Sequence, residues 1–190
     1  MCLIFSLGYS MLVCDQVMSM EQLWFSNLFG AFVSWGGILS AVAAIALIAV
    51  LHRNSPGLEG HVTEKRMHDI GKMIFAFSIF WMYLFFSQYL VIWYGNLPEE
   101  TVFFRDRLGP QFVIDKGFSD AAWARAWSSF DFDWARLDDA YGWTSMIVWA
   151  CCWIVPFWVL LGQKPKQTPA ILGGVATVVL VGLWLERNLL

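Results

Sequence analysis

The chain has 190 residues, of which 58% are hydrophobic and only 14% are charged. A soluble domain usually has about a quarter of its residues charged, so this composition indicates an integral membrane protein and excludes an ordinary soluble enzyme. The net charge is -3, and the charged residues lie in a few segments separated by long uncharged stretches. We expect these stretches to be transmembrane helices, and we expect no nucleic-acid partner.

Five apolar stretches come close to the length that a membrane requires. A helix needs about 20 residues to cross about 30 Å of hydrocarbon. The first stretch ends before Asp15 and is short, and Pro156 in the fourth predicts a kink inside a packed bundle. We therefore expect an all-α, polytopic transmembrane bundle that forms one membrane domain, residues 1–190, with spans at about 2–13, 27–51, 73–95, 144–161 and 170–185.

Basic residues in the connections predict the orientation. The link between the second and third spans holds Arg53, Lys65, Arg66 and Lys72, and the link between the fourth and fifth holds Lys164 and Lys166. Both links fall on one side, which the positive-inside rule places in the cytoplasm. The link at 96–143 holds nine acidic and five basic residues, so we expect it to be external.

The external link contains one segment with helical periodicity. Ser119 is a good N-cap, and large apolar side chains follow it at spacings of three and four. They are Trp123, Trp127, Phe130, Trp134 and Leu137. The pattern predicts an external amphipathic helix that either docks a peripheral partner or the membrane interface, or folds back on its own bundle.

Histidine and cysteine positions argue against a redox centre in this chain. His52, His61 and His68 all lie in or beside the cytoplasmic link, so they cannot form a mid-membrane pair of haem ligands. The four cysteines lack any C-x-x-C spacing, and Cys151 and Cys152 lie in an apolar stretch where a thiol packs as a small hydrophobe. We expect no catalytic residue, no metal ligand and no cofactor bound by this chain.

The third span carries a polar stripe. At 100° per residue its members share a sector of about 100°. They are His68, Asp69, Lys72, Tyr83, Ser87 and Tyr94. Because lipid does not solvate such groups, we expect the stripe to face the protein interior as a proton path or a quinone-facing wall. The alternative is that the charged groups lie at headgroup level and Tyr83 bonds a neighbouring helix.

Acidic and amide groups gather at the outer ends of the first and third spans. Gln88, Glu99 and Glu100 follow or end the third span, and Asp15 ends the first. The three carboxylates could accept protons released by quinol oxidation at that surface, and Gln88 is a further candidate for the proton path or quinone contact there. Alternatively, each is a solvated or partner-binding residue.

Several of these residues belong to recognisable motifs. In order they are Asp15-Gln16-Val17-Met18-Ser19-Met20, Trp24-Phe25-Ser26, His68-Asp69-Ile70-Gly71-Lys72, Phe80-Trp81, Tyr83, Ser87-Gln88-Tyr89, Ile92-Trp93-Tyr94 and Asn96-Leu97-Pro98-Glu99-Glu100-Thr101. Together they resemble the F subunit of alternative complex III over about residues 1–105, and the last two spans match loosely. That complex is a bacterial quinol:cytochrome c oxidoreductase, and its C and F membrane subunits resemble the NrfD/PsrC group.

The resemblance implies a multi-pass subunit of the bacterial inner membrane with no redox centre of its own. Its implied partners are a quinol-binding sister subunit, other membrane subunits, lipid, and peripheral subunits that carry haem c and iron–sulfur clusters. The polar positions that match are Asp15, His68, Asp69, Lys72, Tyr83, Gln88, Tyr94, Glu99 and Glu100. Family members are about twice as long, so the chain resembles a C-terminal half whose N-terminal half would be a further partner. The tryptophan-rich segment 109–141 departs from the family pattern.

We therefore expect a membrane-embedded subunit of a respiratory quinol-oxidising complex that contributes to quinol-linked electron transfer and to proton translocation. The alternative is a non-catalytic structural subunit that anchors the catalytic partners. A small transporter is disfavoured because the spans show no inverted repeat.

Overall fold

The structure is a computed structural model, and it describes residues 2–20, 26, 28–53, 55, 62–95, 97 and 141–189. Every regular element in these ranges is a helix, which confirms the all-α prediction. The elements are α1 (Cys2–Gln16), η1 (Met18–Met20), α2 (Phe29–Leu51), α3 (Glu64–Gly95), α6 (Gly142–Trp149), η4 (Ala150–Ile154), α7 (Val155–Val159), α8 (Gln163–Gln167) and α9 (Pro169–Leu189). The expected external helix with Trp123, Trp127, Phe130 and Trp134 lies outside the described residues, as do Glu99 and Glu100.

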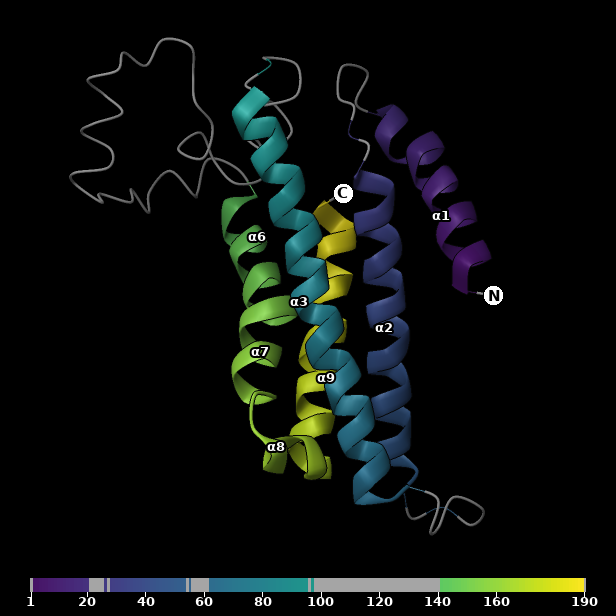
Figure 1. The fold of residues 1–190 in the computed structure, drawn as a ribbon, viewed down its shortest axis with the longest axis vertical. Coiled ribbons are helices and arrows are strands. Elements are labelled where there is room, and N and C mark those ends of the chain that lie inside the picture. The colour runs from purple at the N-terminus through teal and green to yellow at the C-terminus, as the bar shows by residue number, and fades with distance from the viewer. Residues whose placement is uncertain are drawn as a thin grey trace, which may run out of the picture.

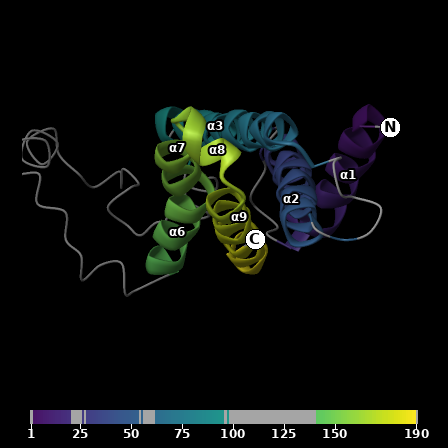
Figure 2. The same cartoon turned by 90° about the horizontal axis from the view of Figure 1, so that it is seen from below.

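Four helices are long and apolar enough to cross a membrane. They are α2, α3, α9 and the continuous rod made by α6, η4 and α7, which spans Gly142–Val159. These four run side by side, and α1 lies against α2 on the outside of the group (Figures 1 and 2). With 15 residues, α1 is shorter than a full span, as its sequence predicted. The chain is a multi-pass α-helical membrane protein.

Two helices extend beyond the predicted spans. Helix α3 begins at Glu64 rather than near residue 73, and α9 continues to Leu189 rather than ending near residue 185. Charged residues end an apolar run but do not end a helix, because Glu, Lys and Arg are good helix formers. The extension of α9 brings Glu186 and Arg187 into the bundle.

The bundle packs closely where small residues face a neighbouring helix. A Cβ added at Gly173 of α9 would lie 3.2 Å from the Val50 side chain of α2, and one at Gly71 of α3 would lie 3.0 Å from Cβ of Lys166. Small residues let helix backbones approach in a membrane, where van der Waals contact rather than water exclusion drives association.

The rod changes from α-helix to π-helix just before Pro156. The backbone N–H of Val155 bonds the carbonyl of Ala150, five residues earlier. Proline lacks an N–H and its ring would clash with the carbonyl four residues before it, so the preceding turn widens. The sequence predicted a disturbance at Pro156, and the structure realises it as the π-helical turn η4.

The two basic links lie at the same end of the bundle. The short helix α8 packs beside the start of α3, at the end of the bundle where α2 ends and α3 begins (Figure 1). Lys166 of α8 is buried, and its Nζ lies 4.8 Å from the centroid of the Phe75 ring. The apolar stem of Lys166 thus packs on α3 while its charge meets an aromatic face.

Candidate functional site

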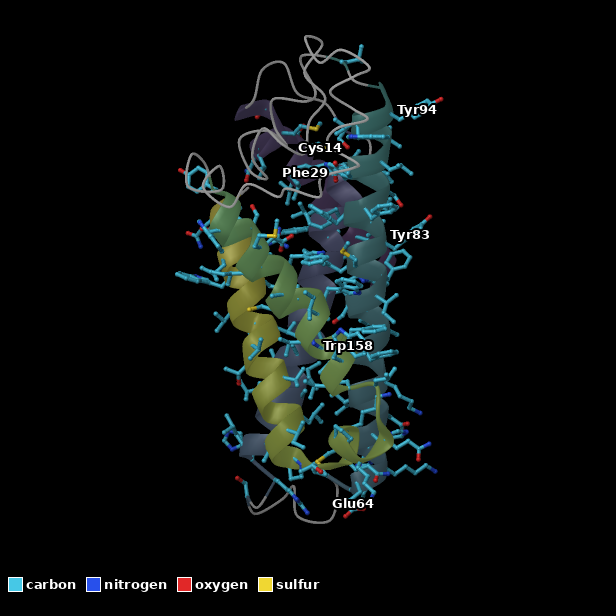
Figure 3. All side chains as sticks on the ribbon, turned by 90° about the vertical axis from the view of Figure 1, so that its left-hand side faces the viewer. Cys14, Phe29, Glu64, Tyr83, Tyr94 and Trp158 are labelled. Carbon is cyan, nitrogen blue, oxygen red and sulfur yellow. The ribbon has the colours of Figure 1, made fainter. Side chains whose placement is uncertain are left out.

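The polar stripe of α3 faces away from the chain's own bundle. Tyr83 is 60% exposed and Tyr94 is 85% exposed, and both side chains point outward (Figure 3). Asp69 and Lys72 are also exposed, whereas His68 and Ser87 are half-buried. The prediction that this stripe faces the interior is therefore wrong for the bundle that this chain forms.

The buried face of α3 lies on the opposite side of the helix. Its residues recur at spacings of three and four, and they are Met67, Gly71, Ile74, Ser78, Trp81, Leu84, Gln88 and Ile92. Apolar side chains suit both lipid and a protein core, so an apolar face does not reveal which of the two it meets. Small residues such as Gly71 and Ser78 were the better indicator, because they mark where another helix approaches closely.

The charged members of the stripe pair with each other. Lys72 Nζ lies 2.6 Å from Asp69 Oδ1, and about half of each side chain is exposed. An exposed pair of this kind contributes little to stability, because water and salt screen the two charges. Of the other candidates, Asp15 is exposed at the end of α1 and Gln88 is buried. The structure therefore does not bring Asp15 and Gln88 together with the stripe.

A different polar cluster is buried between α2, α3, η4 and α9. Its centre is Glu186 of α9, which is 4% exposed. Arg187 places Nη2 3.6 Å from Glu186 Oε2 and donates a 2.9 Å hydrogen bond to the carbonyl of Val33 in α2. Arg187 thus links α9 to α2 and supplies the nearest positive charge to the carboxylate.

Residues of α3, η4 and α2 pack closely around the other sides of this cluster. Trp81 of α3 presents its indole N–H toward Glu186. The centroid of the Trp81 ring lies 5.3 Å from the centroid of the Phe32 ring. The thiol of Cys152 in η4 is fully buried on the Glu186 side of α9. A Cβ added at Gly36 of α2 would lie 2.8 Å from Arg187 Nη2 and 3.3 Å from Glu186 Oε2. Glycine at this position leaves room for the two charged groups.

Several polar atoms in the same core have no hydrogen-bond partner within the described part of the chain. They include both carboxylate oxygens of Glu186, Nε1 of Trp81 and Oγ of Ser78. The Trp81 N–H therefore lies near the carboxylate without forming a hydrogen bond of ordinary geometry. Buried polar groups are normally bonded, so this carboxylate is an exception that needs an explanation.

Sequence reasoning missed Glu186 because it ended the fifth span at about residue 185. The signal was nevertheless present in the spacing. The buried residues of α9 are Leu172, Gly173, Val175, Ala176, Val179, Gly182, Leu183 and Glu186. Glu186 continues the helical face of Leu172, Val179 and Leu183, so a span extended by one turn would have placed it in the core.

The described histidines lie toward the basic end of the bundle. His52 follows α2 and is exposed, and its Nδ1 lies 3.4 Å from Oγ of Ser55. His68 is on the second turn of α3. Within the described ranges, no group of three or more His, Cys, Asp or Glu side chains is arranged to hold a metal ion. The expectations about haem and iron–sulfur clusters remain predictions.

Within the residues that the structure describes, the fold and the cluster define a multi-pass helical membrane protein with one buried carboxylate on α9 and an outward polar face on α3. The sequence matches no protein-family profile and no curated protein.

Proposed function

We propose that this chain is a membrane-embedded subunit of a bacterial respiratory complex that oxidises quinol. In this proposal the redox centres belong to partner subunits, and the chain contributes helix packing and proton movement. The observation that carries the proposal is the outward position of the polar stripe on α3, since polar groups at membrane depth require a protein or water neighbour.

The Tyr83 hydroxyl shows how strongly the stripe requires a neighbour. Helix α3 has 32 residues and is therefore about 48 Å long, which exceeds the about 30 Å of hydrocarbon. Tyr83 lies close to the middle of this helix, so a membrane that α3 crosses would enclose it in hydrocarbon, and its side chain is 60% exposed. A hydroxyl without a partner in an apolar medium costs several kcal/mol, so a second membrane subunit that covers α3 would stabilise it.

The sequence motifs support a quinol-oxidising complex as the assembly that supplies this neighbour. Most of the motifs that resemble the F subunit of alternative complex III lie on α3, and the stripe includes Tyr83, Ser87 and Tyr94 from them. A stripe covered by a sister subunit would form a polar seam between two subunits. Hydroxyl groups in such a seam can both donate and accept protons.

The same geometry favours a second candidate, a structural subunit that holds the catalytic partners. A docking face needs complementary polar groups but no proton chemistry. Two substitutions separate the candidates because they keep apolar bulk and remove the polar atoms: Tyr83→Phe and Lys72→Leu. Tyr141→Phe is the matched control, because Tyr141 is 64% exposed but lies at the start of the α6 rod.

The experiment purifies the chain with its native partners, identifies them by mass spectrometry, and measures complex recovery and quinol oxidation per complex. Slower turnover or reduced charge movement in an intact complex supports the proton-handling function. Reduced recovery with normal turnover supports the structural function. If the co-purified proteins include no quinol-oxidising or redox subunit, the proposal of a respiratory subunit is wrong.

A further inference from the structure

Glu186 is the one buried acidic side chain among the described residues, and neither the stripe nor the sequence motifs account for it. We propose that Glu186 is a proton-binding site inside the membrane, which alternates between a neutral carboxyl and a carboxylate beside Arg187. The reaction is proton transfer alone: a proton from water adds to one carboxylate oxygen and later returns to water. It goes beyond the proposed function and does not require quinol.

Each protonation state has compensating features in the structure. A carboxylate in this core is costly unless a cation and hydrogen bonds compensate for lost water. Arg187 supplies the cation, but its Nη2 lies 3.6 Å from Glu186 Oε2 and also donates a hydrogen bond to the Val33 carbonyl. Neither Glu186 oxygen accepts a hydrogen bond within the described residues. Because this compensation is incomplete, the carboxylate is not strongly favoured over the neutral carboxyl. Protonation removes the buried negative charge.

The other groups facing Glu186 come from three elements. Helix α2 presents Gly36, α3 presents the Trp81 indole, and η4 presents the Cys152 thiol, which lies near Gly182 on the same face of α9. Among these groups and Arg187, only Arg187 carries a permanent charge. The protonation of Glu186 is therefore coupled chiefly to one neighbouring cation.

The size and charge of the site select a proton over other ligands. A single Cβ at Gly36 would already be within 3.3 Å of the carboxylate oxygen and 2.8 Å of the guanidinium. A quinone headgroup or a hydrated metal ion would need these groups to separate. The adjacent guanidinium repels any cation, but a proton forms a covalent bond to a carboxylate oxygen and needs no further ligands, whereas a metal ion needs several.

A route for exchange lies along Arg187. Its side chain is 32% exposed, so the guanidinium reaches from the buried carboxylate to the surface of the bundle. It does so in the last turn of α9, at the opposite end of that helix from the basic link that contains α8. Water at this end can thus approach Glu186 without entering the apolar core.

The test is infrared difference spectroscopy of the chain in lipid, with its native partners, as the pH is changed. We expect a C=O stretching band of a neutral carboxyl that appears as the pH falls and shifts in heavy water. This band should be lost in Glu186→Gln and kept in Glu64→Gln, whose glutamate is exposed at the start of α3. Identical spectra for Glu186→Gln and the unchanged chain would overturn the proposal.

A second measurement covers the case in which the Glu186→Gln variant does not accumulate. Dicyclohexylcarbodiimide is apolar and reacts with neutral carboxyl groups, so it should modify Glu186 in the unchanged chain, and the yield should fall as the pH rises. Mass spectrometry of the C-terminal peptide measures this yield. Modification of Glu186 whose yield does not fall as the pH rises would overturn the proposal. Neither experiment involves quinol turnover, so failure here leaves the proposed respiratory function to its own test.

Discussion

Replacing Gly182 with Ala tests the close packing of α9 against the π-helical turn η4. An added Cβ would lie 2.6 Å from Cβ of Cys151 and 2.8 Å from Sγ of Cys152. Carbon atoms attract best at about 3.5–4.0 Å, so the two helices must separate by about 1 Å. Overpacking of this kind costs about 1–3 kcal/mol. Alanine also favours the helix over glycine by about 0.5–1 kcal/mol, which offsets part of that cost.

Gly174→Ala provides the control on the same helix. Nothing lies within 4 Å of a Cβ at Gly174, so this substitution brings only the gain in helix propensity. Since that gain is common to both variants, the difference between them isolates the packing term. We expect Gly182→Ala to be less stable than Gly174→Ala by about 1–3 kcal/mol.

The assay is reversible unfolding of the purified chain in mixed micelles, in which added dodecyl sulfate denatures it and helical circular dichroism reports the folded fraction. Both variants are compared at equal protein and lipid concentrations. If they have the same free energy of unfolding, α9 does not approach η4 as closely as the structure shows, and the explanation of Gly182 as a packing glycine fails.

Three further predictions concern the charge pair, an interhelical hydrogen bond and the topology. At alkaline pH, Arg187→Met should destabilise the chain by about 3–5 kcal/mol, because it leaves the Glu186 carboxylate without its cation. Adding Glu186→Gln to this variant should recover much of the lost stability. If the two substitutions instead have strictly additive costs, Glu186 and Arg187 are not paired. Trp35→Phe should cost about 0.5–1.5 kcal/mol in the same titration, since the Trp35 indole N–H bonds a backbone carbonyl of α3 at 3.1 Å, and an unchanged stability would count against this bond. In a chain without native cysteines, an impermeant thiol reagent outside the cell should label Arg125→Cys and spare Gly60→Cys, and the reverse result would invert the topology.

The order and nature of the spans follow from the sequence alone. A lipid-facing segment must satisfy every backbone N–H and C=O internally, so an apolar run of about 20 residues in a membrane forms a helix whatever surrounds it. This is why α2, α3, the Pro156-containing rod and α9 could be predicted from composition. The effect of Pro156 was equally local, because proline disturbs the turn before it in any context.

Tertiary packing decides which face of each helix is buried in the bundle. In water, the polar face of a helix turns outward, but in lipid an apolar surface is accommodated on either side, so hydropathy does not distinguish inside from outside. The stripe containing Tyr83 therefore looked buried from its polarity, whereas the approach of α8 at Gly71 turned it outward. The sequence placed Glu186 near the end of a span, but only the contacts of α2, α3 and η4 with α9 made it a buried carboxylate. The neighbours in α2 and α3 are more than 100 residues away in the chain, so no local pattern reveals them.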